Sequence, residues 1–469
     1  MKTEVSEKLI ADIWQRQVIT DLVTDAGQQL QIIYPGRASN CSGCDFLDAV
    51  FSIDGKVIKG DIEIHVKSSQ WYSHGHNQDP KYNRIVLHIA MWHDSRSPTL
   101  LQNGKTIPTV CLSSFLGNSV DKFHRADLRR HPLPSCPQAR EYLNTACLNR
   151  LLATAGEKRF AAKKTSFQIA LNEDEAGQVL FRGIARALGY ANNTEPCEEL
   201  ADRIPLSLLE KLEPEPDAVR QAWILGTAGL LPSQRLNTTY KPFEDEEVEK
   251  LETIWESTGA VATMKKTNWC FFRVRPDNFP TRRLIALSHI LARYGKSGLL
   301  QGMLELVEKA PPQAGHRWLE DGLTIAGQGY WANHFDFGVV KKRSSALLGR
   351  EKAAEIAINV ILPFVCAWGK IVAEPKLKKK AAQIYHHYPK LGDNELTRYM
   401  KQQLLLKSQV GLSARQQQGL IHIFNTYCRC RSCASCPVAL NPGQGWAPRQ
   451  CHSRPSGPTG NDNSRRHQS

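Results

Sequence analysis

Long hydrophobic runs are missing from this sequence. The longest apolar stretch, from Ile356 to Trp368, is interrupted by Asn359 and Pro363, and it is shorter than the roughly 20 residues that a membrane-spanning helix needs. The N-terminal segment carries acidic residues and has no small-residue cleavage site after an apolar run, which argues against a secretory signal. We therefore expect a cytoplasmic chain with no membrane partner, in which the apolar stretch forms a buried helix.

Several catalytic motifs are missing as well. The chain has no Gly-x-Ser-x-Gly nucleophile elbow, no Walker phosphate loop and no Gly-x-Gly-x-x-Gly run after a predicted strand. These absences argue against acyl-transfer and nucleotide-dependent chemistry. No segment recurs at a fixed period, so a repeat architecture is not expected either.

Acidic residues are the scarcer charged type. The 469 residues include 60 Lys and Arg against 46 Asp and Glu, which gives a formal net charge of +14. An excess of positive charge favours polyanionic partners, and nucleic acid is the partner that we expect. Scattered basic runs, such as residues 159–167, 273–283 and 376–382, would together follow a phosphate backbone, although each alone is typical of a solvated helix face.

Two kinds of pattern divide the chain and predict an α+β fold. Within residues 1–120, a helix near Glu7 to Ile19 precedes three short strands, a connecting helix or loop, and two more strands. From 137 to 425 the apolar residues recur with a helical period, which predicts an all-α domain. A cysteine-rich motif follows at 426–437, and residues 438–469 have the composition of a disordered tail.

One predicted strand carries ionisable residues along a single face. In the segment from 56 to 68, a period of two places Asp61, Glu63, His65 and Lys67 on one face and aliphatic residues on the other. The preceding strand begins at Asp45, and a hairpin of this length would bring its carboxylate beside Glu63. Two carboxylates with a basic group are what Mg²⁺- or Mn²⁺-dependent phosphodiester hydrolysis requires. The alternative is a half-exposed strand whose charges pair with those of its neighbours.

The strand order, the Asp that opens the second strand and the Glu-x-basic pattern on the third resemble the core of the PD-(D/E)XK nuclease superfamily. The resemblance covers residues 7 to 120 and implies a restriction-endonuclease-like core that hydrolyses DNA or RNA. It also implies that Asp45 and Glu63 are catalytic metal ligands, that Ile64 offers its backbone carbonyl to the metal, and that His65 or Lys67 supplies the basic group.

The sequence departs from that pattern at two positions. Cys44 stands where the motif has Pro, and His65 stands at the usual Lys position, so the chemistry would rest on Lys67 or be lost. The second hypothesis is therefore a non-catalytic nucleic-acid-binding or scaffold protein with a degenerate core. More closely, the runs GCDFLDAVFSIDG and GDIEIHVKSSQWYSHGHNQDPKYNRIVLHIA, followed by FRGIARALGYANN and GYWANHFDFG, resemble an uncharacterised bacterial family known only as a domain of unknown function.

A polar and aromatic segment follows the ionisable strand. It contains His74 and His76 in a His-Gly-His run, then Asp79 and Tyr82. We predict that these residues contact the substrate, with the imidazoles as phosphate contacts or metal ligands and Tyr82 stacking on a base. Surface polar packing and a place in the hydrophobic core are the alternatives.

Four cysteines lie close together near the C-terminus: Cys428, Cys430, Cys433 and Cys436. In a reducing compartment, thiols at this spacing are typical of a zinc site or an iron–sulfur cluster rather than of disulfides. With Cys41 or Cys44 as an upstream ligand, the layout resembles the iron–sulfur nucleases of the RecB type and implies a [4Fe-4S] cluster. Zinc held by all four cysteines and an unligated tail are the other interpretations.

Overall fold

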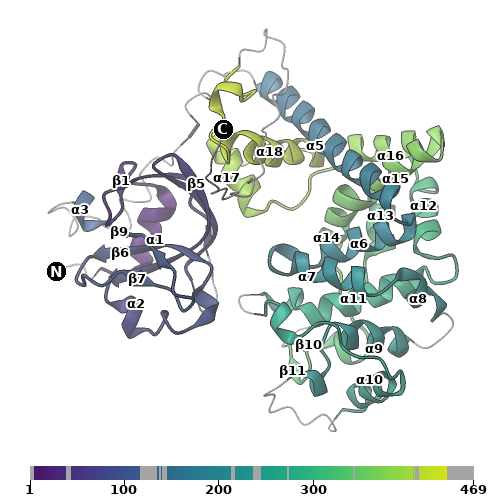
Figure 1. Ribbon diagram of the computed structural model, residues 1–469. Helices are drawn as coiled ribbons and strands as arrows, with labels where there is room; N and C mark the ends of the chain where they lie inside the picture. The colour runs from purple at the N-terminus through teal and green to yellow at the C-terminus, as the bar shows by residue number, and fades with distance from the viewer. Residues whose placement is uncertain are drawn as a thin grey trace, which may run out of the picture.

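The computed structural model describes residues 5–38, 44–116, 135–136, 139, 145–212, 217–235, 245–271, 274–341, 344–404, 406 and 411–440. These residues form the predicted α+β fold (Figure 1). Residues 5–116, here called the sheet part, contain a mixed sheet, and residues 145–440, the helical part, are mostly α-helical. Most of the predicted disordered tail, residues 441–469, lies outside the described residues.

The sheet part is built on seven strands in the order β1-β2-β4-β5-β6-β9, with β3 beside β4. The pairs β2–β4 and β4–β5 are antiparallel, whereas β5–β6 and β6–β9 are parallel. The five predicted strands are present as β2, β4, β5, β6 and β9, and the two-residue strands β1 and β3 were not predicted. The strands span Leu22–Val23 (β1), Gln29–Tyr34 (β2), Arg37–Ala38 (β3), Phe46–Ile53 (β4), Lys56–Lys67 (β5), Ile85–Trp92 (β6) and Thr109–Cys111 (β9).

A two-residue turn sets the register of β4 against β5. Asp54 and Gly55 have φ angles of 46° and 83°, and the residues that flank them, Ile53 and Lys56, are paired. Positive φ at both positions is the geometry that a tight hairpin requires, and an Asp-Gly pair tolerates it well. The turn therefore fixes which residues of β5 point to each face.

Helix α1 covers one face of the sheet. It spans Glu7–Arg16, and the side chain of Ser6 caps it by accepting a hydrogen bond from the amide of Leu9. Its buried face packs against the aliphatic residues of β5 and β6, forming a core that includes Leu9, Ile10, Ile13, Trp14, Ile62, Ile64, Leu87 and Ile89. Each such buried side chain stabilises the fold by about 1.5–3 kcal/mol relative to exposure.

The connection between β5 and β6 and a small hairpin cover the opposite face. The connection holds α2 (Gln70–Ser73) and the 3₁₀ turn η1 (Pro80–Tyr82), and the hairpin is formed by β7 (Thr99–Leu100) and β8 (Thr106–Ile107). Trp71 is fully buried here, and its indole N–H donates to the carbonyl of Leu100 at 2.9 Å. The middle of β5 is consequently buried on both faces.

The helical part contains one departure from the predicted all-α domain. Strands β10 (His334–Asp336) and β11 (Val339–Val340) form a two-stranded antiparallel sheet, too short to show an alternating pattern in the sequence. The helices are α5 (Thr145–Glu173), α6 (Ala176–Leu188), α7 (Tyr190–Arg203), α8 (Leu206–Lys211), α9 (Asp217–Thr227), α10 (Glu246–Ser257), α11 (Pro280–Arg293), α12 (Leu299–Glu308), α13 (Gly315–Leu323), α14 (Arg350–Ile356), α15 (Leu362–Ile371), α16 (Pro375–His387), α17 (Glu395–Gln403) and α18 (Ala414–Ile423).

The long apolar stretch forms the predicted buried helix. Helices α14 and α15 join through a π-helical turn, and the segment Arg350–Ile371 is long and apolar enough to cross a membrane by length and composition alone. Most of it is packed inside the helical part. Pro363 has no N–H to donate to the carbonyl of Asn359, and Nζ of Lys163 lies 3.5 Å from that carbonyl oxygen.

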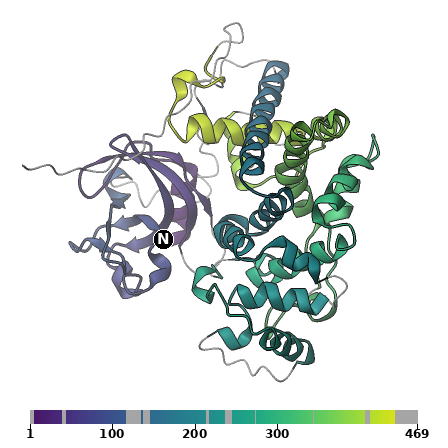
Figure 2. The same cartoon turned by 45° about the vertical axis from the view of Figure 1, so that its right-hand side comes forward.

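The end of the described chain packs against the sheet. Figures 1 and 2 show α17, α18 and the segment after them beside the sheet part. Tyr34 and Val50 of the sheet share a hydrophobic cluster with Phe424 and Tyr427. The guanidinium of Arg431 donates to Oγ of Ser52 at 2.9 Å. The C-terminal segment is therefore part of the folded structure as far as residue 440.

Candidate functional site

The face of β5 and β6 opposite α1, here called the polar face, carries buried ionisable side chains. Glu63 and His65 on β5 are 5% and 1% exposed, and His88 on β6 is fully buried. Glu63 is paired with His88 across the parallel strands. The alternation predicted for β5 is confirmed, but the face is covered rather than half-exposed.

Four imidazoles, here called the histidine cluster, meet on the polar face: His65, His74, His76 and His88. Nδ1 of His65 lies 2.9 Å from Nε2 of His88, and Nε2 of His65 lies 3.3 Å from Nε2 of His76. Nε2 of His76 also lies 3.4 Å from Oε1 of Glu63. Ligand atoms of His65, His74 and His76 all lie within 4.8 Å of one another, a spacing that suits a metal ion.

A hydrogen-bonded chain continues from the cluster into the sheet. Nδ1 of His88 lies 3.1 Å from Oγ1 of Thr99, which lies 2.8 Å from Oγ1 of Thr109. All three residues are buried. The chain holds the His88 ring in one orientation, and through it the ring of His65.

Aromatic rings close the cluster from the side of the β5–β6 connection. The ring of Tyr82 lies 4.0 Å from that of His76, between centroids, and Trp71 lies 5.3 Å from both His76 and His88. His74 is the exposed member of the cluster. The rings exclude water from the buried imidazoles, while His74 keeps one side open to solvent.

Burial keeps the inner imidazoles neutral. Desolvation, reinforced by the neighbouring imidazoles, lowers the pKa of His65 to about 2 and that of His88 to about 3. Desolvation likewise lowers the pKa of His76 to about 4. A neutral imidazole has a lone pair for a metal, but it cannot replace the positive charge of a lysine, which is the role that the resemblance implies for His65 or Lys67.

Asp45 lies where the hairpin was expected to bring it. It stands just before β4, and its Oδ2 accepts a hydrogen bond of 2.8 Å from the amide of Ile64, the residue between Glu63 and His65. The carboxylate of Asp45 is therefore held against the backbone of β5 at the position next to Glu63. Lys67 is exposed at the end of β5, and its predicted catalytic role stays a prediction.

Asp61 and Cys44 have structural partners beside the site. Oδ1 of Asp61 accepts from the amide of Asp48, where a register shift interrupts the pairing of β4 with β5, and Nε of Arg84 lies 3.6 Å from Oδ2. Cys44 is buried, with its Sγ 4.0 Å from the same carboxylate. Asp61 thus fixes the bulge next to the site.

Asp79 and Tyr82, both predicted to contact the substrate, also have local roles. Oδ1 of Asp79 accepts from the amide of Lys81 at 2.9 Å and caps η1. Tyr82 is part of the aromatic cover over His76. These roles account for both positions without a ligand, and the substrate contacts stay predictions.

The C-terminal cysteines meet a partner that the sequence did not indicate. Burial, and then the thiols of Cys436, Cys136 and Cys433, raise the pKa of Cys428 to about 12. Burial also raises the pKa of Cys436 to about 11, with Cys136 and Cys433 again among the causes. Cys430 is exposed, and its Sγ lies 3.9 Å from the carbonyl of Asn425.

Cys136, which is distant in sequence, is a cysteine that the structure places beside the C-terminal ones. It packs against the same hydrophobic cluster as Cys428 and Cys436. Cys44, one of the two expected upstream ligands, lies instead in the separate core around Trp71. Cys41, the other, lies outside the described residues.

Two arginines of one basic run are not available to a phosphate backbone as expected. Arg282 is fully buried and donates to the carbonyls of Trp331 and His334 at 2.5 and 2.7 Å. Arg283 is 5% exposed and donates to the carbonyl of Leu347. Within the run 273–283, these arginines bind backbone carbonyls of the helical part.

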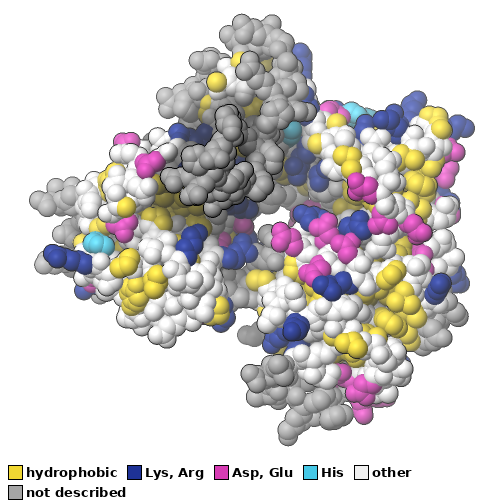
Figure 3. Space-filling view, in the orientation of Figure 1, with side chains coloured by type: hydrophobic (Ala, Val, Ile, Leu, Met, Phe, Trp, Pro, Cys, Tyr) yellow, Lys and Arg dark blue, Asp and Glu magenta, His cyan; other side chains and the backbone are white. Residues whose placement is uncertain are grey.

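Two hollows offer positive charge. A cleft of about 630 Å³ lies between the sheet and helical parts and is lined by Arg37, Lys59, Arg275, Arg398 and Arg429 together with acidic residues. Figure 3 shows basic side chains on the side of the sheet part that faces the helices. Lys59 shares the face of β5 with Glu63, about 13 Å away along the strand.

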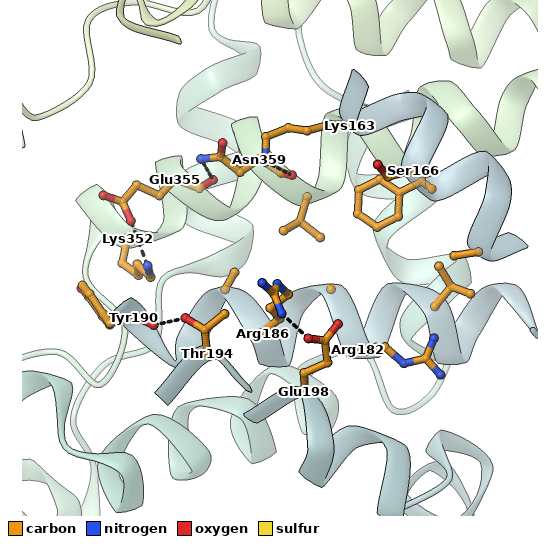
Figure 4. A pocket seen from close by; sticks show the side chains of 16 residues that line it. Lys163, Ser166, Arg182, Arg186, Tyr190, Thr194, Glu198, Lys352, Glu355 and Asn359 are labelled. Atoms are coloured by element: carbon orange, nitrogen blue, oxygen red, sulfur yellow. Dashed lines mark hydrogen bonds and ion pairs between the residues drawn. The ribbon is translucent and has the colours of Figure 1, made fainter. Parts of the chain in front are cut away.

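The second hollow lies inside the helical part. A cavity of about 680 Å³ is lined by residues of α5, α6, α7 and α14, with Lys163, Arg186 and Lys352 around it (Figure 4). Burial, with the charges of Arg159 and Arg186, lowers the pKa of Lys163 to about 8. Its basic residues suit an anionic ligand, and among the described residues no three metal-ligating side chains gather there.

Residues 7–394 match the family described as "Protein of unknown function (DUF2851)". The chain belongs to this family. The match covers the histidine cluster and most of the helical part, and it ends before Cys428. No curated protein and no solved structure matches the chain.

Sequence reasoning missed two residues that complete these sites. His88 lies on a β-type run. If that run is assumed to pair in parallel with β5, the position of His88 beside Glu63 can be predicted. Cys136 had no local signal, because it is distant in sequence from the C-terminal cysteines.

Proposed function

We propose that this protein is a metal-dependent nuclease-like enzyme that hydrolyses phosphodiester bonds in nucleic acid, with its metal centre on the polar face. The observation that carries the proposal is the gathering of Glu63 and three imidazoles on the polar face, with Asp45 hydrogen-bonded to the backbone of β5 next to Glu63. The order of helix, strands and connection, which the nuclease resemblance implies, also supports it.

The donor set fits a divalent ion. The ligand atoms of His65, His74 and His76 are within 4.8 Å of one another, and Glu63 brings a carboxylate to the same point. A bound ion would stabilise charge on the phosphate and lower the pKa of a water molecule. The resemblance implies Mg²⁺ or Mn²⁺. Mg²⁺ prefers oxygen ligands, whereas imidazoles are better ligands for zinc and iron than for Mn²⁺. This donor set does not exclude Mg²⁺ or Mn²⁺.

The chain's own residues would bind and orient the substrate. Trp71 and Tyr82 keep water from the buried side of the cluster, and the exposed His74 faces the open side. Lys67 at the end of β5 and Arg84 beside Asp61 are the cations nearest along these strands. The cleft with Lys59 continues the same face of β5 and would receive the nucleic-acid backbone.

A Cys-bound cluster would be a second, structural site. We propose that Cys136, Cys428, Cys433 and Cys436 hold it, with Cys136 in the place first given to Cys41 or Cys44. A zinc ion held by four thiolates and an iron–sulfur cluster held by the same cysteines are both compatible with this donor set. Either group would join the C-terminal segment to residue 136.

Hydrolysis is tested with the full-length protein, fluorescent single- and double-stranded DNA and RNA, and Mn²⁺, Zn²⁺ or Mg²⁺. We expect cleavage that depends on the ion and that falls at least 100-fold in Glu63→Gln, because the carboxylate is removed at the metal centre. Glu308→Gln, at an exposed glutamate of α12, is the matched control and should keep wild-type activity. Equal cleavage by Glu63→Gln and wild type would refute the assignment.

The same assay can instead show that the protein binds nucleic acid without cleaving it. In that case the protein would retain salt-sensitive affinity for nucleic acid, with no cleavage in any of the three ions. This result would favour the non-catalytic hypothesis over the enzyme.

A further inference from the structure

We propose that His65, His74 and His76 bind a divalent transition-metal ion of the Zn²⁺, Co²⁺ or Fe²⁺ class in preference to Mg²⁺, with the carboxylate of Glu63 beside it. The inference deepens the proposed function by naming the metal. It rests on the proposed function only in that both give Glu63 a place at the metal centre. Metal binding is measurable without any substrate, so the two stand or fall separately.

The distances between donor atoms match those around one tetrahedral ion. Metal–nitrogen and metal–oxygen bonds of about 2.0–2.1 Å place neighbouring ligand atoms about 3.3–3.4 Å apart. Nε2 of His65 and Nε2 of His76 are 3.3 Å apart, and Nε2 of His76 and Oε1 of Glu63 are 3.4 Å apart. Two edges of the expected polyhedron are therefore already present.

The local chain conformation aims the third ligand at the same point. His74 ends α2, and Gly75 follows with a φ of 73°, in the left-handed region. This turn reverses the chain between His74 and His76, so that both rings contact His65, at 5.0 and 5.1 Å between centroids. Since His74 is exposed and the other two are buried, an ion can enter from the His74 side and keep an open position there.

Hydrogen bonds from His65 to His88 and from His88 to Thr99 hold the His65 ring in a form that can bind a metal ion. We assign Nδ1 of His65 as donor to Nε2 of His88, and Nδ1 of His88 as donor to Oγ1 of Thr99. In this arrangement Nε2 of His65 keeps its lone pair directed at His76 and the proposed ion. Metal-binding histidines generally donate their other N–H in this way, and such partners are worth 10- to 100-fold in metal affinity.

The type of donor selects the ion. Three imidazoles and one carboxylate make a nitrogen-rich set, which binds zinc, cobalt and iron well. Mg²⁺ requires oxygen ligands in octahedral geometry and retains much of its water. The ligand set thus departs from the Mg²⁺ that the nuclease resemblance implies.

The test is a titration of chelator-treated, full-length protein with Co²⁺, followed by its visible absorption. Tetrahedral cobalt with nitrogen and oxygen ligands absorbs in the visible range, and its thiolate complexes add charge-transfer bands at shorter wavelength. We expect one equivalent without those thiolate bands, which a large excess of Mg²⁺ does not displace and Zn²⁺ does.

Variants show which residues bind the single equivalent of Co²⁺. His74→Ala removes an exposed ligand and should fold normally, and we expect its Co²⁺ affinity to fall at least tenfold. His76→Ala should lose the band. His387→Ala, at an exposed histidine of α16, and Cys433→Ser, in the separate cysteine group, are matched controls that should keep this equivalent.

Unchanged affinity and spectrum in both His74→Ala and His76→Ala would overturn the proposal, as would Co²⁺ binding that Cys433→Ser alone abolishes. Stoichiometric, histidine-dependent binding by a protein that cleaves no nucleic acid would refute the proposed function and leave the metal site standing. Ion-dependent cleavage by a protein that shows no histidine-dependent Co²⁺ binding would refute the metal site and leave the proposed function standing.

Discussion

The two faces of β5 and β6 are buried to the same extent by different means. On one face Ile62, Ile64 and Ile89 pack against α1, and their burial stabilises the fold directly. On the other, Glu63 and His65 lie equally deep but must be desolvated, which costs free energy unless partners compensate. The comparison indicates that the apolar face holds the sheet part together, whereas the polar face is retained for what it binds.

The largest expected effect comes from breaking the apolar face. Ile89→Ala should lower the free energy of unfolding by about 2–5 kcal/mol, because Ile89 is fully buried and its removal leaves a cavity. Urea denaturation of the chelator-treated protein measures the loss, and Ile89→Val, expected to cost about 0.5–1.5 kcal/mol, is the control. Loss of Co²⁺ binding in a folded Ile89→Ala protein would contradict the division of labour between the faces.

Acid should weaken the polar face without touching the apolar one. In the metal-free protein, the folded-state pKa values of His65 and His88 lie far below the ordinary value near 6.5. Below pH 6.5 the unfolded chain binds protons that the folded chain does not, so stability falls with pH towards the folded values. Between pH 7 and 5 each buried imidazole should cost about 2 kcal/mol.

Denaturant melts at pH 7, 6 and 5 in the presence of a chelator check this dependence. His88→Gln should reduce the loss of unfolding free energy between pH 7 and 5 by the contribution of one imidazole. His387→Gln, at an exposed position, should leave the pH dependence unchanged. A pH-independent stability over this range would mean that the cluster is already protonated or solvated in the fold.

The cover over the polar face should contribute less. Trp71→Phe keeps most of the ring but removes the indole N–H that donates to the carbonyl of Leu100, so we expect a loss of about 1–3 kcal/mol in unfolding free energy. Trp318 is the matched control, since it is exposed and its indole donates to the carbonyl of Leu306. An equal loss of unfolding free energy in Trp318→Phe and Trp71→Phe would contradict the idea that burial makes the Trp71 hydrogen bond important.

The smallest effect is expected at the turn between the two ligands. Gly75→Ala places a side chain at a left-handed φ, which costs about 1 kcal/mol, and nothing lies within 4 Å of the added methyl group. Co²⁺ affinity should fall with it, since the turn aims His74 and His76. Gly411→Ala, at an equally open site without positive φ, should change neither stability nor affinity.

Local sequence patterns predicted the main strands of the sheet part. Alternation along β5 placed Glu63 and His65 on one face, and the expected hairpin is formed by β4 and β5. The buried helix at Ile356 to Trp368 was also foreseeable, because Asn359 and Pro363 interrupt an otherwise apolar run.

Features that depend on distant contacts could not be predicted in this way. The pairing of Glu63 with His88 follows from the parallel register of β5 and β6, which no local pattern encodes. The approach of Cys136 to Cys428 joins residues far apart in the chain. The burial of Arg282 among backbone carbonyls arises from the packing of α11, whereas its sequence context is typical of a basic surface run.

The most direct measurement of the central claim is anomalous X-ray diffraction from crystals of the full-length protein grown with Zn²⁺, collected above and below the zinc absorption edge. We predict an anomalous peak between Nε2 of His65, Nε2 of His76 and the ring of His74, within about 2.0–2.1 Å of each ligand atom. A map with no peak at the histidine cluster, and with His65 and His76 in direct contact, would contradict it.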